Sequence, residues 1–310
     1  MPHWNATTPV RPRNVKKTSK SSPSFAEEIY DARAGRPRGV LRPPPAEGRL
    51  RHARKSPTAD LEPWVQHFWS VSWDLRGCDP FLQETLPHPN VHIIFDRDGA
   101  HVAGVHTARF STTLEGTSRV FGIKFRPGGF RPFLRSPVGA LANRTVPARQ
   151  VFGAAAPQWG LAMQSLPDDD AQIAAASDFL RDRLPAADSN VALATRLVEQ
   201  ILNAEESEIR SVQELSRRSG ISQRSLQRLF QEYVGASPKW VIRRYRLHEL
   251  VERLKAGDVV DGAQAALDLG YFDQAHLIND FRSIVGYSPA RYGSLLRRPA
   301  EPPQEISFSS

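Results

Sequence analysis

The chain has 310 residues, of which 40% are hydrophobic and 24% charged, so it is long enough for two domains with ample cores. Its single cysteine, Cys78, excludes an intramolecular disulfide and a multi-cysteine zinc site. No apolar run approaches the ~20 residues of a membrane-spanning helix, and the N-terminus has no apolar signal segment, so we expect a cytoplasmic protein.

The net charge of +8 comes from the first part of the chain. Residues 1–55 hold 13 Lys and Arg against 4 Asp and Glu, and the rest of the chain is close to neutral. This part is rich in Pro, Ser and Arg and has no sustained apolar period, so residues 1–56 are expected to be a disordered basic tail. It is either a solvated tail or over-long gene start, or an arm that adds non-specific affinity for phosphates. Residues 297–310 are expected to be a second disordered tail.

Residues 57–152 show a strand-like pattern. Short β-rich runs are separated by Gly, Pro and Asp turns, which favours an antiparallel sheet or barrel. The Arg126-Pro127-Gly128-Gly129 segment breaks the pattern after the last run. The predicted strands lie at 68–73, 91–95, 102–105 and 120–125.

Residues 153–206 become helical, because apolar residues recur at spacings of three and four over 171–184 and 191–202. We expect this region to be a helical linker or a dimerisation region. The predicted fold class is therefore α+β, with an antiparallel β domain and its following helices ahead of an all-α domain over 207–296.

Several side chains of the β region are candidates for chemistry. The four histidines lack a compact metal-ligand spacing, so scattered structural or surface histidines are favoured over a metal site, and we expect no cofactor. The aromatic residues are more typical of core packing than of a pocket. Arg126 is a candidate pocket cation, and Cys78 lies in a turn with nothing beside it to lower its pKa. The histidines are His88, His92, His101 and His106, and the aromatic residues are Trp64, Trp69, Trp73 and Phe81.

The next segment has the pattern of a helix, a glycine turn and a second helix. Ser211 and Glu214 form a capping box, Gly220 permits the turn, and Ser222 caps the following helix. That helix has an apolar face, and its opposite face carries Arg and Gln, the side chains that make bidentate contacts with guanine and adenine in the major groove. The pattern predicts a helix-turn-helix unit, with a solvated amphipathic helix pair as the alternative. The polar face consists of Arg224, Gln227, Arg228 and Gln231.

A repeat favours the helix-turn-helix interpretation. Ser237-Pro238 begins a long helix that is expected to reach Lys255, roughly 27 Å at 1.5 Å per residue, close to one turn of DNA. The unit before this helix recurs after it at an offset of 51 positions. Leu226, Phe230, Gly235, Ser237 and Pro238 recur as Leu277, Phe281, Gly286, Ser288 and Pro289.

Residues 208–294 resemble the DNA-binding domain of the AraC family of bacterial transcription regulators. The resemblance rests on Gly-x-Ser-x-x-x-Leu-x-Arg-x-Phe with Gly-x-Ser-Pro in the first unit, and on Ala-x-x-Leu-Gly-Tyr with Gly-x-Ser-Pro in the second. It implies two recognition helices in successive major-groove segments. By position, Arg224, Gln227 and Arg228 would contact DNA in the first unit. Gln274, Ala275, Ile278 and Asn279 would do so in the second.

The second unit departs from the family pattern. Asn279 stands where the family commonly has Arg, and residues 256–292 hold 2 Lys and Arg against 5 Asp and Glu. Residues 210–255 hold 11 against 4. Because phosphate contacts supply much of the affinity, the first unit is expected to dominate.

Residues 58–152 resemble, less strongly, an uncharacterised β-rich sensor-like domain that precedes this DNA-binding module in actinobacterial proteins. The similarity rests on Trp69, Leu86-Pro87-His88-Pro89, Phe125-Arg126-Pro127-Gly128 and Phe130. It implies an effector-binding or dimerisation domain.

These patterns predict a sequence-specific transcription regulator that binds double-stranded DNA. RNA polymerase, a small-molecule effector and a second copy of the chain are further partners compatible with that function. The alternatives are a metal-dependent β-barrel enzyme with a helical appendage and a protein-interaction adaptor. The sequence lacks a Gly-rich phosphate loop, a Cys-x-x-Cys pair and a nucleophile elbow, so we expect no enzyme.

Overall fold

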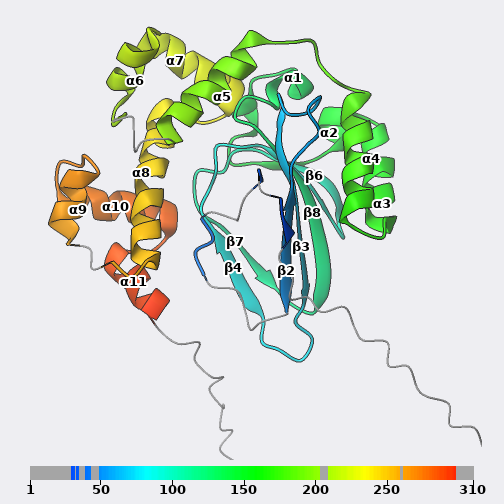
Figure 1. Cartoon of the computed structure of the whole chain (residues 1–310), viewed down its shortest axis with the longest axis horizontal. Coiled ribbons are helices and arrows are strands. Elements are labelled where there is room, and N and C mark those ends of the chain that lie inside the picture. Colours follow the sequence, from blue (N-terminus) through cyan, green and yellow to red (C-terminus); the bar gives the residue numbers. More distant parts are fainter. Residues whose placement is uncertain are drawn as a thin grey trace, which may run out of the picture.

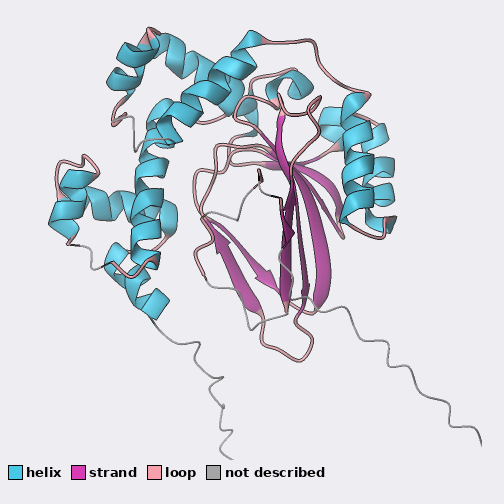
Figure 2. Cartoon of the chain, in the orientation of Figure 1, coloured by secondary structure: helices cyan, strands magenta, loops and turns pink. Residues whose placement is uncertain are grey.

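The computed structural model describes residues 29–31, 33, 34, 39–42, 49–202, 209–258 and 261–297. Most of the two expected tails lies outside the described residues. Among the described residues, the strands lie together, with α3 and α4 on one side of them and the helices from α5 to α11 on the other (Figures 1 and 2). Among the described residues, no helix combines the length and the apolar character needed to cross a membrane.

The larger sheet has seven strands in the order β1-β2-β3-β8-β5-β6-β9, and a smaller sheet pairs β4 with β7. All described pairs are antiparallel except β1 with β2. The strands are β1 (Ile29–Tyr30), β2 (Leu50–Lys55), β3 (Val65–Asp74), β4 (Phe81–Thr85), β5 (His92–Asp96), β6 (Gly99–Ala103), β7 (Phe110–Leu114), β8 (Thr117–Phe125) and β9 (Thr145–Pro147).

One face of the larger sheet is apolar. Phe68 and Ile93 lie opposite Ile123 on neighbouring strands, so their side chains share this face. The helices α3 (Ala155–Ser165) and α4 (Asp169–Arg181) cover it (Figure 1). Trp159 of α3 stacks on Phe179 of α4 with ring centroids 3.5 Å apart. The sheet and these helices therefore enclose one buried core.

Short helical turns connect the sheet to α3, and a run of helices follows α4. The connecting turns are α1 (Arg131–Leu134), η1 (Val138–Leu141) and α2 (Arg149–Phe152). The later helices are α5 (Ser189–Leu202), α6 (Val212–Ser219), α7 (Gln223–Leu229), η2 (Phe230–Val234), α8 (Pro238–Lys255), α9 (Gly262–Asp268), α10 (Gln274–Val285) and α11 (Pro289–Arg297).

The long helix α8 has the predicted bounds and no break. The hydroxyl of Ser237 accepts a hydrogen bond from the Trp240 amide (3.2 Å), and Pro238 occupies the first turn. Gly257 follows with φ +89°, the left-handed conformation that favours glycine after a helix end. The predicted connection between two helical units is therefore present as one continuous helix.

The structure corrects the expected tail at 50–55. These residues form β2, which pairs with β3 from Leu50 opposite Trp73 to Lys55 opposite Phe68. Only Ala53 within β2 is a buried apolar residue, and basic side chains occupy most other positions, so the segment has the composition of a solvated tail. Hydrogen bonding to β3 makes it a strand in spite of that composition.

The helical region 153–206 divides in two. Helices α3 and α4 pack on the sheet, whereas α5 packs in the core of the first C-terminal unit beside Leu226, Phe230 and Trp240. The apolar stripe of α5 includes Ala194, Leu197 and Val198. We therefore propose that the C-terminal domain begins near residue 189 and that α5 is not a linker.

Candidate nucleic-acid interface

The first unit consists of α6, a turn at Gly220 and α7. Gly220 has φ +69°, which a residue with a side chain adopts only with strain. The Ser211 hydroxyl accepts from the Glu214 amide (3.1 Å), while the Glu214 carboxylate accepts from the Arg210 amide (2.8 Å). The N-terminus of α6 is therefore fixed by local hydrogen bonds, as the capping pattern predicted.

The first turns of α7 leave a polar face open to solvent. Arg224, Gln227 and Arg228 are exposed, while Leu226 and Phe230 are fully buried on the opposite side. In a helix-turn-helix unit, the N-terminal residues of the second helix reach base edges. The three polar residues predicted for the first unit therefore lie together on the exposed face of α7, and their contact with DNA stays a prediction.

Gln231 lies apart from these three residues. At Phe230 the helix widens into the π-helical segment η2, which changes the direction of the side chains that follow. The amide of Gln231 packs against Gly139 of η1 so closely that a Cβ at Gly139 would collide with it. Gln231 is exposed and contacts the β domain through this amide, so its contact with DNA stays a prediction.

The second unit consists of α9, a turn at Gly270 and α10. The Asp273 carboxylate caps α10 by accepting from the His276 amide (2.7 Å). Of the predicted contacts, Gln274, Ala275 and Asn279 are exposed and Ile278 is half-buried. The Gln274 amide packs against Gly262 at the start of α9, so Gln274 also contacts the other helix of its own unit.

An ion pair fixes the second unit on α8. Arg243 of α8 binds Asp280 of α10 at 3.1 Å, and the Asp280 side chain is only 14% exposed. His276 lies 3.9 Å from the other oxygen of the same carboxylate. The ion pair therefore links the connecting helix α8 to the second helix of this unit, α10.

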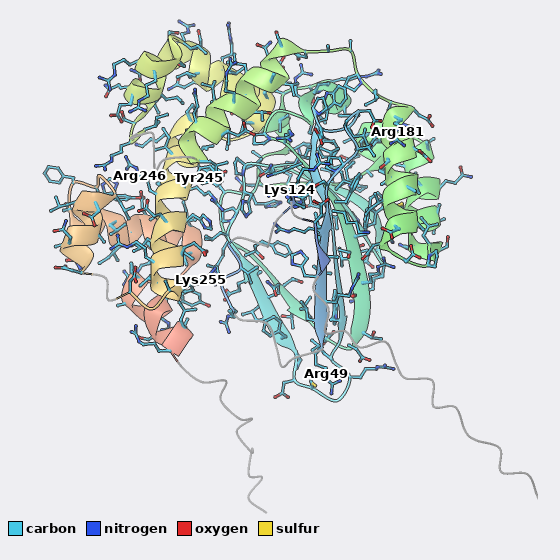
Figure 3. The ribbon with its side chains drawn as sticks, viewed as in Figure 1. Arg49, Lys124, Arg181, Tyr245, Arg246 and Lys255 are labelled. Carbon is cyan, nitrogen blue, oxygen red and sulfur yellow. The ribbon has the colours of Figure 1, made fainter. Side chains whose placement is uncertain are left out.

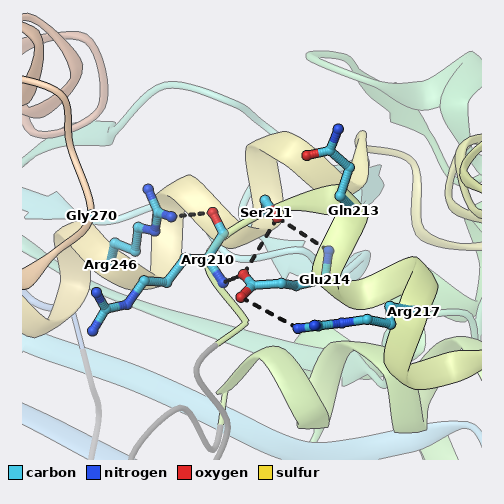
Figure 4. Close-up of a pocket in the computed structure, with 7 residues that line it drawn as sticks. All are labelled: Arg210, Ser211, Gln213, Glu214, Arg217, Arg246 and Gly270. Carbon is cyan, nitrogen blue, oxygen red and sulfur yellow. Dashed lines mark hydrogen bonds and ion pairs between the residues drawn. The ribbon is translucent and has the colours of Figure 1, made fainter.

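A hollow of about 580 Å³ lies between the two units, lined mainly by arginine and polar side chains (Figure 4). Arg210 and Arg217 belong to the first unit, and Arg246 projects from α8 and donates to the Arg210 carbonyl. Burial holds the pKa of Arg246 below its ordinary value. The basic charge of residues 210–255 was visible in the sequence. That three of these arginines, Arg210, Arg217 and Arg246, meet at a hollow between the units is shown only by the structure.

The comparisons agree with this geometry. Residues 215–294 match the family model described as a helix-turn-helix domain. The C-terminal domain is an AraC-type helix-turn-helix domain. Residues 53–147 match a second model, described as a domain of unknown function (DUF6597), which covers most of the β region ahead of the AraC-type domain.

Solved structures are similar to parts of the chain at low identity. A transcriptional regulator from Chromobacterium violaceum with an AraC-type DNA-binding domain is 22% identical, covering 35% of this chain and 98% of that chain (TM-score 0.30). ToxT from Vibrio cholerae is 14% identical, covering 70% and 89% (TM-score 0.32). A ToxT structure with bound unsaturated fatty acid is 12% identical, covering 82% and 96% (TM-score 0.35). None of the curated proteins matches the chain.

The histidines and Arg126 ahead of the AraC-type domain have structural partners. Within the described ranges, no group of three or more His, Cys, Asp or Glu side chains is placed to hold a metal ion. His92 accepts from the Trp69 indole (3.2 Å), His106 contacts Thr145 (3.3 Å) and His101 lies 3.7 Å from Asp96. Arg126 donates to the Glu62 carbonyl (2.6 Å) and lies 3.4 Å from the Glu199 carboxylate of α5.

The aromatic candidates are mostly packing residues. Trp73 lies in a small buried cluster with Phe81 at its edge, and Trp64 meets Phe133 edge to face at 6.4 Å. Trp69 covers Gly122 so closely that a Cβ there would collide with the indole. Cys78 is exposed.

Proposed function

We propose that the chain is a sequence-specific DNA-binding transcription regulator whose two helix-turn-helix units contact one face of the duplex. The observation that carries this proposal is that an unbroken α8 joins two glycine-turn units, each with exposed polar residues at the start of its second helix. With 18 residues, α8 spans roughly 27 Å, close to the ~34 Å between successive major-groove segments.

The side chains of the first unit suit base reading and phosphate binding. Arg224 and Arg228 can bind guanine or a phosphate, and Gln227 can bind adenine through both ends of its amide. Arg210 and Arg217 border the hollow between the units, where a DNA strand would cross from one major-groove segment to the next. We propose that these two arginines bind phosphates and contribute affinity without sequence preference.

The second unit offers weaker contacts. Ala275 and Ile278 present only apolar groups, which suit a thymine methyl, whereas Asn279 can bind adenine and Gln274 can reach a base or a phosphate. Five acidic residues in this part of the chain oppose close approach of the phosphates. We propose that the second unit adds selectivity to an affinity set mainly by the first.

The β domain is proposed to control DNA binding, as an effector-binding or dimerisation domain. The hydroxyl of Thr195 in α5 donates to the Pro127 carbonyl (2.8 Å), and Arg131 binds Glu232 of η2 (2.6 Å), so a change in the β domain would reach the first unit directly. RNA polymerase, a small-molecule effector and a second copy of the chain are proposed partners besides DNA. We propose a cytoplasmic location and no catalytic activity.

Selection from randomised duplex DNA tests the function. The purified full chain is incubated with the pool at fixed salt, and the bound sequences are recovered and counted. We expect an enriched motif with two contact segments about 10 base pairs apart. The Arg224→Ala/Arg228→Ala double variant should lose the enrichment, and Gln231→Ala, its matched control, should retain it. A folded wild-type protein that enriches no sequence would contradict the proposal.

A further inference from the structure

The turns of the two helix-turn-helix units differ by one residue. In the first unit, only Ile221 lies between the glycine of the turn and the residue that caps α7. In the second unit, both Tyr271 and Phe272 lie between the glycine and the residue that caps α10. The two glycines, Gly220 and Gly270, have nearly the same φ, +69° and +68°, so both turns begin in the same way. The second turn therefore holds one residue without a counterpart in the first.

Tyr271 takes the packing role that Ile221 has in the first unit. Ile221 packs on the apolar cluster that contains Leu226 of α7. Tyr271 is 6% exposed and belongs to the corresponding cluster of the second unit. Arg246 of α8, labelled in Figure 3, lies over the Tyr271 ring with its guanidinium carbon 5.6 Å from the centroid. The additional residue of the second turn is therefore Phe272.

The Phe272 side chain points into solvent. It is 92% exposed, more than any other large apolar residue in the part of the chain that the structure describes. An apolar residue just ahead of a helix cap commonly packs on the fourth residue of the helix, which is Leu277 in α10. A side chain that is 92% exposed has almost no area in such a contact. Phe272 therefore contributes little to the folded state.

Single exposed apolar residues are common on protein surfaces, so the position of Phe272 matters more than its exposure. It directly precedes Asp273, the cap of α10, and the exposed residues continue without interruption from 272 to 276. In a helix-turn-helix unit the start of the second helix reaches the base edges. Figure 1 shows α9, which leads into this turn, on the side of α8 away from the sheets. The ring thus lies beside the residues predicted to contact DNA.

The charge of the second unit favours an apolar partner on DNA over a phosphate. Residues 256–292 hold 2 Lys and Arg against 5 Asp and Glu, which opposes close phosphate contact. Ala275 and Ile278, two of the predicted contacts on α10, are also apolar. The apolar group that bases present in the major groove is the 5-methyl group of thymine, and phenylalanine is among the side chains that pack on it.

We infer that Phe272 is a specificity-determining residue whose ring packs on a thymine methyl group in the second DNA segment. Burial of an exposed ring supplies affinity without a charge, which suits a unit that has few cations. The first unit lacks an equivalent residue, so this preference for thymine belongs to the second segment alone. The inference rests on the proposed function and names a base that its second unit selects.

Substitution of thymine by 2′-deoxyuridine tests the contact, because it removes the methyl group and keeps every hydrogen-bonding group of the base. Each thymine in the second segment of the selected motif is replaced singly, and the affinity of the full chain is measured by gel shift. We expect one substitution to lower wild-type affinity by about three- to tenfold. Phe272→Ala should lower affinity for the unmodified motif by a similar factor and should no longer respond to that substitution.

Leu267→Ala is the matched control. Leu267 is 63% exposed and lies on α9 of the same unit, away from the start of α10. This variant should bind the motif and respond to deoxyuridine as wild type does, and both variants should keep the wild-type melting temperature because both side chains are exposed. Phe272→Ala should also keep the wild-type salt slope, whereas loss of a phosphate contact lowers the slope by about one.

Two results would overturn the inference and leave the proposed function in place. They are a selected motif without thymine in its second segment, and wild-type affinity of Phe272→Ala for the motif. If that variant also lost binding to RNA polymerase, the ring would belong to a protein contact instead. Weaker binding by Phe272→Ala with an unchanged response to every deoxyuridine would place the ring on the DNA backbone and overturn the methyl contact. A wild-type protein that enriches no sequence would overturn the proposed function and this inference together.

Discussion

Tyr287, in the turn between α10 and α11, donates its hydroxyl to the Glu84 carboxylate of β4 at 3.0 Å. The Glu84 side chain is 1% exposed and also binds Arg42 (2.6 Å) and Arg109. Arg109 lies over the Tyr287 ring with its guanidinium carbon 4.9 Å from the centroid. One buried carboxylate therefore anchors the second DNA-reading unit to the smaller sheet.

Replacing this carboxylate should destabilise the protein more than removing its tyrosine partner. Glu84→Gln leaves two arginines without a counter-charge and should lower the free energy of unfolding by about 2–3 kcal/mol. Tyr287→Phe loses one hydrogen bond but keeps the ring under Arg109, so we expect about 1 kcal/mol. Urea denaturation of both variants measures the difference, and equal effects would show that the charge of Glu84 is not the main anchor.

Arg228→Ala should weaken binding to the selected DNA motif by about 1–3 kcal/mol if Arg228 makes a bidentate contact, and Arg224→Ala should act similarly. Gln231→Ala is the internal control, because Gln231 lies in η2, after α7, and its amide packs on Gly139 of the β domain. Gel-shift titration at fixed salt compares the three. Wild-type affinity in both arginine variants would remove them from the interface, and a large effect of Gln231→Ala would place Gln231 in the interface as well.

Ile278→Ala should cost less DNA affinity than Gln227→Ala, although the two residues occupy equivalent positions in the repeat. Gln227 can exchange two hydrogen bonds with a base, whereas Ile278 offers only apolar contact and is half-buried. Loss of a first-unit phosphate contact should also reduce the salt slope by about one. Titrations over a salt series check both expectations, and an equal or larger loss for Ile278→Ala would mean that the second unit reads DNA as strongly as the first.

Stability should rise with pH between about 7 and 9. Burial, with a further effect of the like charges of Arg54 and Arg244, lowers the pKa of Lys124 of β8 from 10.5 to about 7 in the folded chain. In this interval the unfolded chain therefore holds a proton that the folded chain lacks. The free energy of unfolding then increases by up to about 1.4 kcal/mol per pH unit from this group. Arg54 and Arg244 stay charged, and the neighbouring histidines His67 and His92, whose pKa values burial lowers, stay neutral over this interval. None of these groups therefore cancels the rise in the free energy of unfolding. Urea midpoints across this range should show the rise in wild type and lose it in Lys124→Met.

The local patterns of the C-terminal part were sufficient to predict its helices. Serine and aspartate caps and glycine turns depend on near neighbours, so α6 to α11 and the exposure of Arg224, Gln227 and Arg228 could be read from the sequence. The strands predicted at 68–73 and 120–125 are also present, because their β-rich composition is likewise a local property of the sequence.

Features that depend on contacts between residues far apart in the sequence could not be predicted from local patterns. β2 is basic and becomes a strand only by pairing with β3, and α5 has an ordinary amphipathic stripe whose partner lies in the first unit. The π-helical segment that turns Gln231 toward Gly139 leaves no mark in the spacing of the residues. The burial of Arg244 arises where α8 meets the loop after β4, because its guanidinium donates to Pro87, a residue more than 100 positions away in the sequence.

The unbroken α8 also determines the rotational phase of the operator. A rigid connector cannot follow a change in the angle between two contact segments, and each inserted base pair turns the second segment by about 34° relative to the first. The Arg243–Asp280 ion pair restrains the junction of α8 with α10. If one base pair is added between the two contact segments of the operator, the second segment turns away from the exposed residues of α10. We therefore expect both units to bind at once only on natural sites with a single spacing between the segments.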